Sequence, residues 1–316
     1  MLDEAADDRL ITTCAQPLLE DIFGRKLRIA NYKITKRLMD YRVMVLVLDA
    51  PIDHDGACEV VLKFAGPQAP RRSSFERTQR VHQLVLSETD LPVARIFSAN
   101  DRPSRWPWRY LVMERLAGHP WAEVRGGMTL GDSGMVYQQI GEAVAKLHLV
   151  QLPSFGEDIE GGGTQDYPSA LREHARQILP NPRLYDYFLQ ALEKCSGLFE
   201  HVQNPSLCHE DLHAHNLLIQ KQSEGWQLSG ILDFDKAWVG QAESDLARID
   251  FWRGMSSPDF WTGYRMLRLE DPFYPELRPM YQLLWCLEYA QSTPEHVGDT
   301  WQVCRQLGLP LIASFN

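Results

Sequence analysis

The spacing of apolar residues along the chain changes after about residue 118. Before that point there are five short runs rich in β-branched and aromatic residues, at residues 27–35, 43–49, 57–64, 91–97 and 109–118. Runs of this kind predict β-strands. Residues 73–86 and part of residues 1–24 have apolar positions at helical spacing. We therefore expect an antiparallel sheet with one main helix in this part of the chain.

Beyond residue 118 the pattern is mainly helical. Val136, Ile140 and Val144 recur at helical spacing after Asp132, which we expect to cap their helix. The 316 residues suffice for two domains with separate cores, and Gly and Pro cluster where strand character ends. The sequence thus predicts an α+β fold with an N-terminal domain (1–113), a linker (114–118) and a C-terminal domain (119–316).

The most informative stretch lies in the C-terminal domain. His209, Asp211 and Asn216 form the pattern H-x-D-x-x-x-x-N, and Asp233 ends a later apolar run, Gly230-Ile-Leu-Asp-Phe-Asp235. Between the two motifs, apolar segments flank a polar turn at residues 221–225, which predicts a β-hairpin. Polar residues between apolar runs often form only a solvated turn. The joint pattern of two apolar flanks and a second acid is much more specific.

The residue types of this stretch suit phosphoryl transfer. Asp211 could accept a proton from an attacking hydroxyl group. Asn216 and Asp233 offer hard oxygen ligands, which suit Mg²⁺ better than a soft metal. A base and two metal ligands, without a covalent nucleophile, are what a kinase needs from its protein.

The His-x-Asp-x-x-x-x-Asn loop followed by Ile-Leu-Asp-Phe-Asp resembles the aminoglycoside phosphotransferase and choline kinase group. This resemblance implies a bilobal protein-kinase-like fold, ATP (or GTP) and Mg²⁺ as cofactors, and a small hydroxylated acceptor. Glu210 and Asp235 stand where protein kinases usually have Arg and Gly, and both departures favour small-molecule kinases. The region where a phosphate-covering loop should lie, residues 36–42, contains no glycine.

The resemblance also implies a nucleotide site in the N-terminal domain. Lys63, at the end of an apolar run, would contact the nucleotide phosphates, although a lone strand lysine is usually an edge charge. Glu76 would hold Lys63, or would instead close a capping box with Ser73, and Glu88 is the reserve partner for the lysine.

Two further sets of residues follow from the same resemblance. Main-chain groups of Glu114, Arg115 and Leu116 would contact the adenine edge, unless this segment is a plain connection between a strand and a helix. His209 and Asp245 would brace the catalytic loop, and Asp245 could also cap a helix.

Composition limits the kinds of partner molecule and the cellular location that we expect. The net charge of −10 disfavours nucleic acid, which demands a basic face, and is compatible with a cationic acceptor. No apolar run is long enough to cross a membrane, and the acidic N-terminus does not resemble a signal peptide. Six scattered cysteines without C-x-x-C favour reduced thiols in the cytoplasm.

Two other functions remain open. The histidines and acids of residues 209–235 could form the metal site of a hydrolase, in which Zn²⁺ or Fe activates water. A degraded kinase fold could also serve as a binding module. If the chain is a kinase, its acceptor could be an aminoglycoside, another antibiotic, choline, an amino acid or a sugar derivative.

Overall fold

The computed structural model describes residues 9–38, 40–52, 56–67, 69, 74–252, 254–291 and 293–312. Contacts divide the chain into two compact units. Unit 1 comprises Met1–Ser87, Pro92–Ala117 and Gly230–Asp235, and unit 2 comprises Glu88–Leu91, Gly118–Ser229 and Lys236–Asn316. The main change of unit falls after Ala117, within the segment predicted as a linker. Sequence alone did not indicate that residues 230–235 belong with the N-terminal unit.

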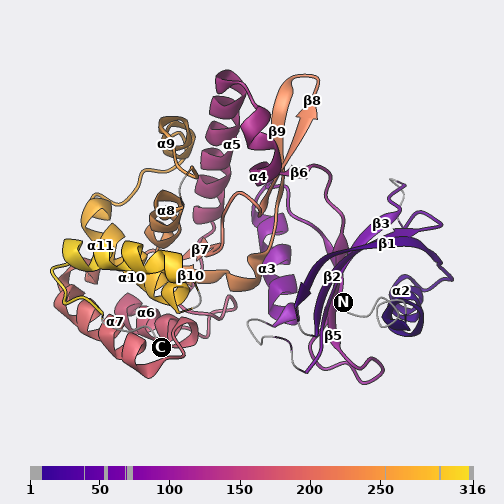
Figure 1. Cartoon of the computed structure of the whole chain (residues 1–316), viewed down its shortest axis with the longest axis horizontal. Helices are drawn as coiled ribbons and strands as arrows, with labels where there is room; N and C mark the ends of the chain where they lie inside the picture. Colours follow the sequence, from indigo (N-terminus) through magenta and orange to yellow (C-terminus); the bar gives the residue numbers. More distant parts are fainter. Residues whose placement is uncertain are drawn as a thin grey trace. The chain divides into compact units, whose positions relative to one another are not determined.

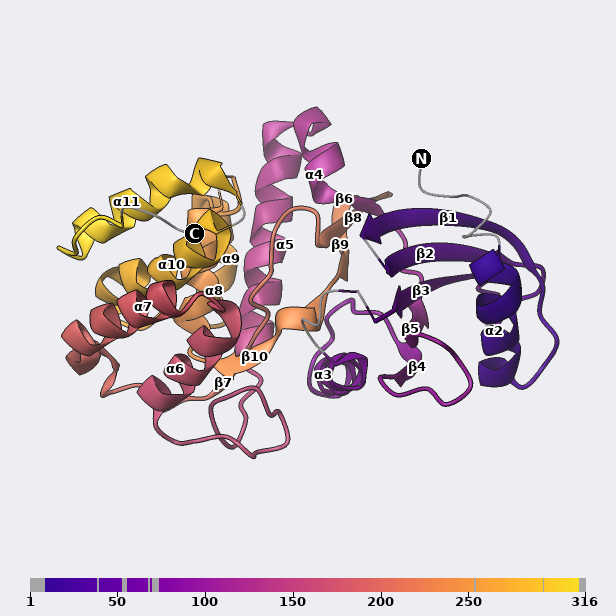
Figure 2. The same cartoon turned by 60° about the horizontal axis from the view of Figure 1, so that its bottom comes forward.

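Unit 1 is built on a five-stranded antiparallel sheet, seen with its strands side by side in Figure 2. The strand order is β1-β2-β3-β5-β4, with β1 at Ile29–Leu38, β2 at Tyr41–Leu48, β3 at Glu59–Ala65, β4 at Ile96–Asn100 and β5 at Arg109–Glu114. Strand β3 is central, and its Lys63 pairs in register with Val43 on one side and Leu111 on the other.

Helices cover both faces of this sheet. Helix α2 (Gln16–Phe23), preceded by a π-helical turn (Ile11–Ala15), packs Leu18 and Leu19 into a core with Met44 and Leu46. Helix α3 (Phe75–Glu88) is labelled in Figure 1. It contributes Phe75 to a second core. Side chains of a strand alternate between faces, so one sheet can supply both cores.

The N-terminus of α3 is capped by Ser74 and Asp101. Ser74 Oγ accepts the N–H of Arg77 at 3.0 Å, and the Asp101 carboxylate accepts the N–H groups of Phe75 at 3.0 Å and Glu76 at 3.1 Å. These bonds satisfy amide groups that have no partner within the helix. The capping box proposed between Ser73 and Glu76 involves Ser73, which lies outside the described residues.

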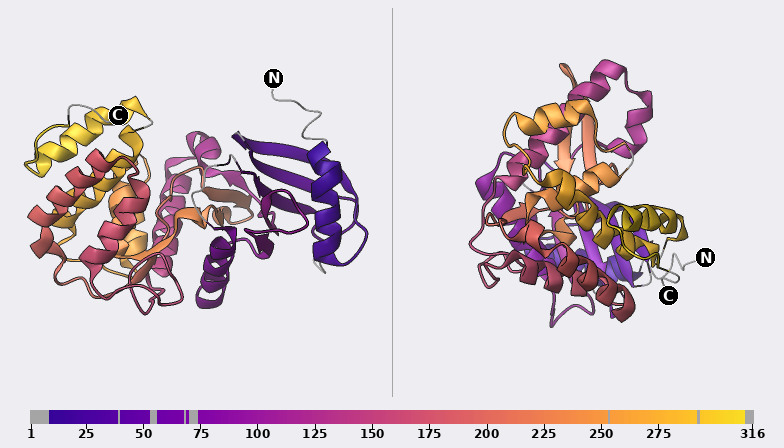
Figure 3. Two further views of the ribbon diagram at one scale, coloured as in Figure 1. Left: turned by 90° about the horizontal axis from the view of Figure 1, so that it is seen from below. Right: turned by 90° about the vertical axis from the view of Figure 1, so that its left-hand side faces the viewer.

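Unit 2 is mainly helical, as Figure 3 shows for its long helices. Its helices are α4 (Trp121–Val124), α5 (Leu130–His148), α6 (Tyr167–Ile178), α7 (Pro182–Lys194), α8 (Ala242–Phe251), α9 (Pro258–Arg265), α10 (Tyr274–Ala290) and α11 (Val297–Gln306). The cap of α5 is Thr129, not Asp132: the hydroxyl of Thr129 accepts the Asp132 N–H at 3.1 Å.

Short strands carry the candidate catalytic loop. Strand β7 (Ser206–Cys208) pairs with β10 (Trp238–Gly240) and leads into residues 209–216. The predicted hairpin then follows as β8 (Leu217–Gln222) and β9 (Gly225–Ile231), with β6 (His119–Pro120) beside β8. The predicted α+β class, with a sheet-rich N-terminal part and a helical C-terminal part, is confirmed. In the described part of the chain no helix is both long and apolar enough to span a bilayer.

Candidate active site

In unit 1, Lys63 is buried between two acids that follow the hairpin. Its Nζ lies 2.8 Å from Asp233 Oδ1 and 3.2 Å from Asp235 Oδ2, and the residue is 6% exposed. Burial alone would lower the pKa of this lysine, but Asp235 and Asp233 outweigh it and raise the pKa well above its usual value. The charge of Lys63 in turn lowers the pKa of Asp233. Lys63 and Asp233, far apart in sequence, therefore form one charged cluster.

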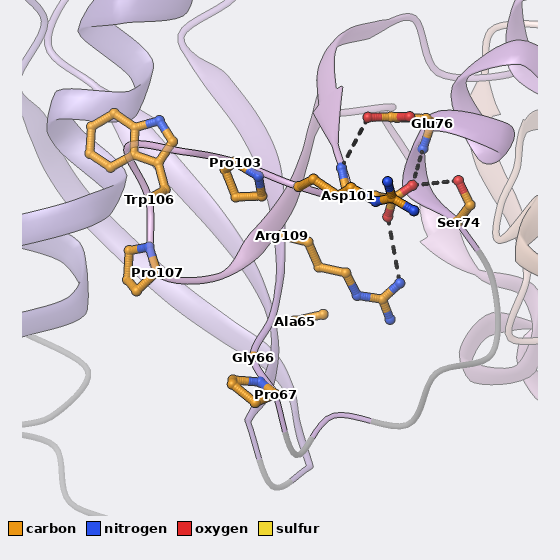
Figure 4. Close-up of a pocket in the computed structure, with 11 residues that line it drawn as sticks. Ala65, Gly66, Pro67, Ser74, Glu76, Asp101, Pro103, Trp106, Pro107 and Arg109 are labelled. Atoms are coloured by element: carbon orange, nitrogen blue, oxygen red, sulfur yellow. Dashed lines mark hydrogen bonds and ion pairs between the residues drawn. The ribbon is translucent and has the colours of Figure 1, made fainter.

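The predicted pairing of Lys63 with Glu76 is replaced in the structure by this cluster. Glu76 lies in the first turn of α3, and its carboxylate accepts the N–H of Asp101 at 3.2 Å. It lines a cavity of about 750 Å³ together with Ser74, Asp101 and Arg109, whereas Lys63 is not part of that lining (Figure 4). The reserve partner, Glu88, is exposed at the last residue of α3.

Asp235 is a partner of Lys63 that was not predicted from the sequence. One of its oxygens contacts Lys63, and the other accepts the hydroxyl hydrogen of Thr78 from α3 at 3.1 Å. Burial raises the pKa of Asp235 despite the charge of Lys63. Helix α3 is thus connected to the lysine through Thr78 and Asp235. The sequence held a signal, because an acid at residue 235 was a noted departure from protein kinases.

Some polar groups of the linker segment already form hydrogen bonds within the protein. The N–H of Glu114 donates to Arg95 O at 2.9 Å, and the Glu114 carboxylate accepts the N–H of Arg95 at 3.1 Å. The guanidinium of Arg115 donates to Leu116 O. An adenine contact through the amide of Glu114 would therefore compete with the sheet. The amides of Arg115 and Leu116 are the better candidates.

In unit 2, Asp245 fixes the start of the catalytic loop. Its Oδ2 accepts the N–H of His209 at 2.6 Å, and its Oδ1 accepts the N–H of Glu210 at 2.7 Å. His148 Nε2 lies 3.2 Å from Oδ2. Burial alone would raise the pKa of Asp245, but the hydrogen bond and charge of His148, the charge of His209 and its amide together lower the pKa. Two consecutive amides on one carboxylate hold the turn in which Glu210 adopts a φ of 60°.

Asp211 follows directly and is held by two cations. Arg248 Nη2 donates to Asp211 Oδ1 at 2.9 Å, and Lys236 Nζ lies 3.6 Å from the same oxygen. The N–H of Asp211 donates to His209 Nδ1 at 3.2 Å. Burial would raise the pKa of Asp211, but Arg248, Lys236 and two nearby histidines outweigh it and hold the pKa below its usual value. Asp211 is therefore ionised at neutral pH, as a general base requires.

Neither Arg248 nor Lys236 was expected from the sequence. Arg248 is 1% exposed within α8, and Lys236 ends the 3-10 turn Phe234–Lys236. Lys236 also pairs with Glu288 of α10 at 2.9 Å. The only sign of Arg248 in the sequence is that an arginine interrupts the apolar run of residues 246–249. The sequence gives no sign of the role of Lys236.

Asn216 and Asp233 fit the demands of a hard divalent cation. Asn216 Nδ2 donates to the main-chain oxygen of Asp211 at 2.8 Å, so the amide oxygen points away from this bond and is available as a ligand. Asp233 is kept ionised by Lys63. Nowhere in the described residues do three His, Cys, Asp or Glu side chains group so as to hold a metal ion.

These features define a class of protein. An antiparallel sheet with a buried lysine, an H-x-D-x-x-x-x-N loop braced by a downstream acid, and a second acid after a hairpin are the parts of a protein-kinase-like phosphotransferase. A family model described as "Phosphotransferase enzyme family" matches residues 50–280. The chain belongs to this family.

Relatives match over part of their length. The chain is 28% identical over 123 residues to a 3-deoxy-D-manno-octulosonic acid kinase of Actinobacillus succinogenes, covering 38% of this chain and 43% of that one. It is 35% identical over 83 residues to the kinase of that name from Haemophilus influenzae, covering 26% and 27%. The chain thus matches less than half the length of these curated relatives.

Solved structures match over nearly the whole chain. A candidate fructosamine-3-kinase from Thermobifida fusca has a TM-score of 0.67 at 17% identity, covering 93% of this chain and 98% of that one. The aminoglycoside phosphotransferase APH(4)-Ia has a TM-score of 0.63 at 16% identity, covering 94% and 98%. At such low identity this similarity establishes the protein-kinase-like fold.

Proposed function

We propose that the chain is a kinase that transfers the γ-phosphoryl group of ATP, or of GTP, to a hydroxyl group of a small molecule. The observation that carries the proposal is the geometry around Asp211: a half-buried carboxylate on a loop clamped by Asp245, with one oxygen held by Arg248 and Lys236. Membership of the phosphotransferase family supports it.

Each residue has a role in this proposal. Asp211 accepts the proton of the acceptor hydroxyl, while Asp245 and His209 keep the loop in shape. Lys63, anchored by Asp233 and Asp235, binds the nucleotide phosphates. Main-chain groups of residues 114–116 contact the adenine edge. Glu76 has no part in the proposal, because its carboxylate accepts the N–H of Asp101 and Lys63 pairs with other acids.

A magnesium ion would be held by the oxygen of Asn216 and the carboxylate of Asp233. When bound, it neutralises negative charge on the phosphates during transfer. The protein residues contribute positioning and fixed charges, which are the main sources of catalysis in phosphoryl transfer.

We favour a polyhydroxylated compound as the acceptor, on the basis of the related kinases and of the charges around Asp211. Two aminoglycoside phosphotransferases related in fold have been solved with hygromycin B and with streptomycin. An aminoglycoside is therefore one candidate acceptor, and it would make the protein a resistance enzyme. The curated relatives are named as kinases of a sugar acid. Lys236 beside Asp211 would repel an ammonium group placed at the base, so we favour a neutral or acidic sugar-like acceptor. We also propose action in the cytoplasm, where nucleoside triphosphates are available and thiols stay reduced.

A nucleotide-consumption screen tests the proposal. The panel contains aminoglycosides, neutral sugars, sugar acids and choline, each with ATP or GTP and Mg²⁺, and Asp211→Asn is the control. We expect turnover with at least one class of acceptor and a loss of about 100-fold or more in the variant. Equal turnover by the variant would show that the base is wrongly assigned. A nucleotide-dependent thermal shift without turnover on any acceptor would instead favour the binding-module alternative.

A further inference from the structure

Arg248 is a deeply buried cation beside the catalytic loop. It lies in α8 with 1% of its surface exposed, and its guanidinium rests on the ring of Trp285. Nη2 donates to Asp211 Oδ1 at 2.9 Å and to the hydroxyl of Tyr289 at 3.2 Å, and Nη1 lies 3.7 Å from Glu210 Oε2. The guanidinium is therefore fixed on several sides before any substrate binds.

Both cations near the base contact the same oxygen of Asp211. Arg248 and Lys236 each approach Oδ1, at 2.9 and 3.6 Å, whereas Oδ2 has no partner among the described residues. The N–H and main-chain oxygen of Asp211 are bonded to His209 and Asn216. Backbone and side chain are thus both restrained, and one carboxylate oxygen is left for another group.

Fold stability alone does not account for this arrangement. Arg248 Nε is buried without a partner among the described residues, and an unpaired buried donor on a charged group costs free energy. A buried ion pair is also often no more stable than an apolar replacement of similar volume. The planar fork of the guanidinium, by contrast, can fix the orientation of a carboxylate in a way that a flexible ammonium group cannot.

Building on the proposed function, we propose that Arg248 is a positioning residue that holds Asp211 through Oδ1, so that Oδ2 is the oxygen that takes the proton. In this step the O–H bond of the acceptor breaks and its proton goes to Oδ2. The electron pair left on the acceptor oxygen forms the new bond to the γ-phosphorus. The bond from that phosphorus to the bridging oxygen breaks, and its electron pair leaves with the nucleoside diphosphate. Lys236 assists from its more exposed place on Oδ1.

The test is chemical rescue of Arg248→Ala. The probe is ADP formation from MgATP with water as acceptor, repeated with the best acceptor of the screen. Because misplacement of a catalytic group costs on the order of 100-fold, we expect kcat to fall by about that factor while KM changes by less than about threefold. Millimolar guanidinium should restore about tenfold of the loss, urea at the same concentration should not, and Asp211→Asn should not respond to either.

Two further variants separate positioning from folding. Arg248→Met keeps an unbranched side chain that can fill the site beside Trp285, and this variant should fold with the same low kcat. Arg248→Lys should keep part of the activity. The matched control is Arg268→Met, because Arg268 is also paired, but to Glu243 at 3.0 Å and to Tyr264 and not to Asp211. It should lower thermal stability and leave kcat unchanged.

The outcomes are distinct. A folded Arg248→Met variant with wild-type kcat, an equal loss of kcat in Arg268→Met, or rescue by urea would overturn the inference and leave the proposed function intact. Absence of Asp211-dependent ADP formation in the wild type would overturn the function and the inference together.

Discussion

Replacement of Asp245 by Asn is the most informative perturbation of the catalytic loop. Asp245 accepts three hydrogen bonds, from the amides of His209 and Glu210 and from His148. Asn keeps the size of the side chain but exchanges one accepting oxygen for an NH₂ donor. Either one buried N–H (that of Glu210) or two (those of His209 and His148) then face another donor, depending on how the amide group is turned.

The expected loss of stability in Asp245→Asn can be estimated from these hydrogen bonds. A hydrogen bond to a charged group contributes about 1.5–3 kcal/mol, and an orphaned buried donor costs about 1–3 kcal/mol. With the other bonds weakened by loss of charge, we expect Asp245→Asn to lower the free energy of unfolding by about 3 kcal/mol. Loss of the turn should also displace Asp211 and lower kcat by about 100-fold.

The pH dependence gives a second signature. The pKa of Asp245 is lowered in the folded state, since the polar partners outweigh burial. A lowered carboxylate pKa contributes stability above the ordinary Asp pKa of about 3.9 and loses it as the pH falls through the folded value. The stability difference between wild type and Asp245→Asn should therefore be full at neutral pH and shrink in acid.

Urea unfolding at several pH values and ADP formation measure both effects. Asp186→Asn, an exposed residue of α7, is the matched control and should change stability by less than about 0.5 kcal/mol. If Asp245→Asn unfolded like the control, or kept wild-type turnover, the bracing of the loop by this carboxylate would be refuted.

The remaining predictions concern unit 1 and the packing of unit 2. Asp235→Asn removes a charge from Lys63 and should raise the KM for nucleotide several-fold, while Glu76→Gln, at the cap of α3, should leave it unchanged, as steady-state kinetics can show. Gly141→Ala should destabilise the protein by about 2 kcal/mol or more, because its Cβ would lie 2.1 Å from a backbone oxygen of α9. Gly126→Ala, in open space, should differ from wild type by less than about 0.5 kcal/mol in the same denaturation assay.

Each of these has a clear contrary result. A nucleotide KM more sensitive to Glu76→Gln than to Asp235→Asn would restore the original pairing of Lys63 with α3. A Gly141→Ala variant as stable as Gly126→Ala would show that α5 and α9 can separate at little cost.

The strands and the catalytic hairpin could be predicted because their signals are local. Alternation along a strand and turn residues at a hairpin need no knowledge of the rest of the fold. The partners of Lys63 could not be predicted, because they depend on which face of α3 is buried. The buried residues of α3 are Phe75, Thr78, Val81, His82 and Val85. Their spacing of three to four residues places Glu76 on the exposed side of the helix.

The contacts of Asp211 could not be predicted from the sequence for a similar reason. Arg248 stands 37 residues after Asp211, and a charge in a helix is usually read as part of a solvated face. Only the packing of α8 against α10 shows that it is enclosed by aromatic rings. Likewise, residues 230–235 begin at the end of β9, but they belong to unit 1 and contribute their acids there.

The central claim is that Asp211 drives transfer of a phosphoryl group from a nucleotide to a hydroxyl. Mass spectrometry of the acceptor after incubation with ATP labelled at the γ-phosphate tests it most directly. The account predicts one labelled phosphoryl group on the acceptor with the wild type and about 100-fold less with Asp211→Asn. Label found only in free phosphate, or equal label on the acceptor with both proteins, would contradict it.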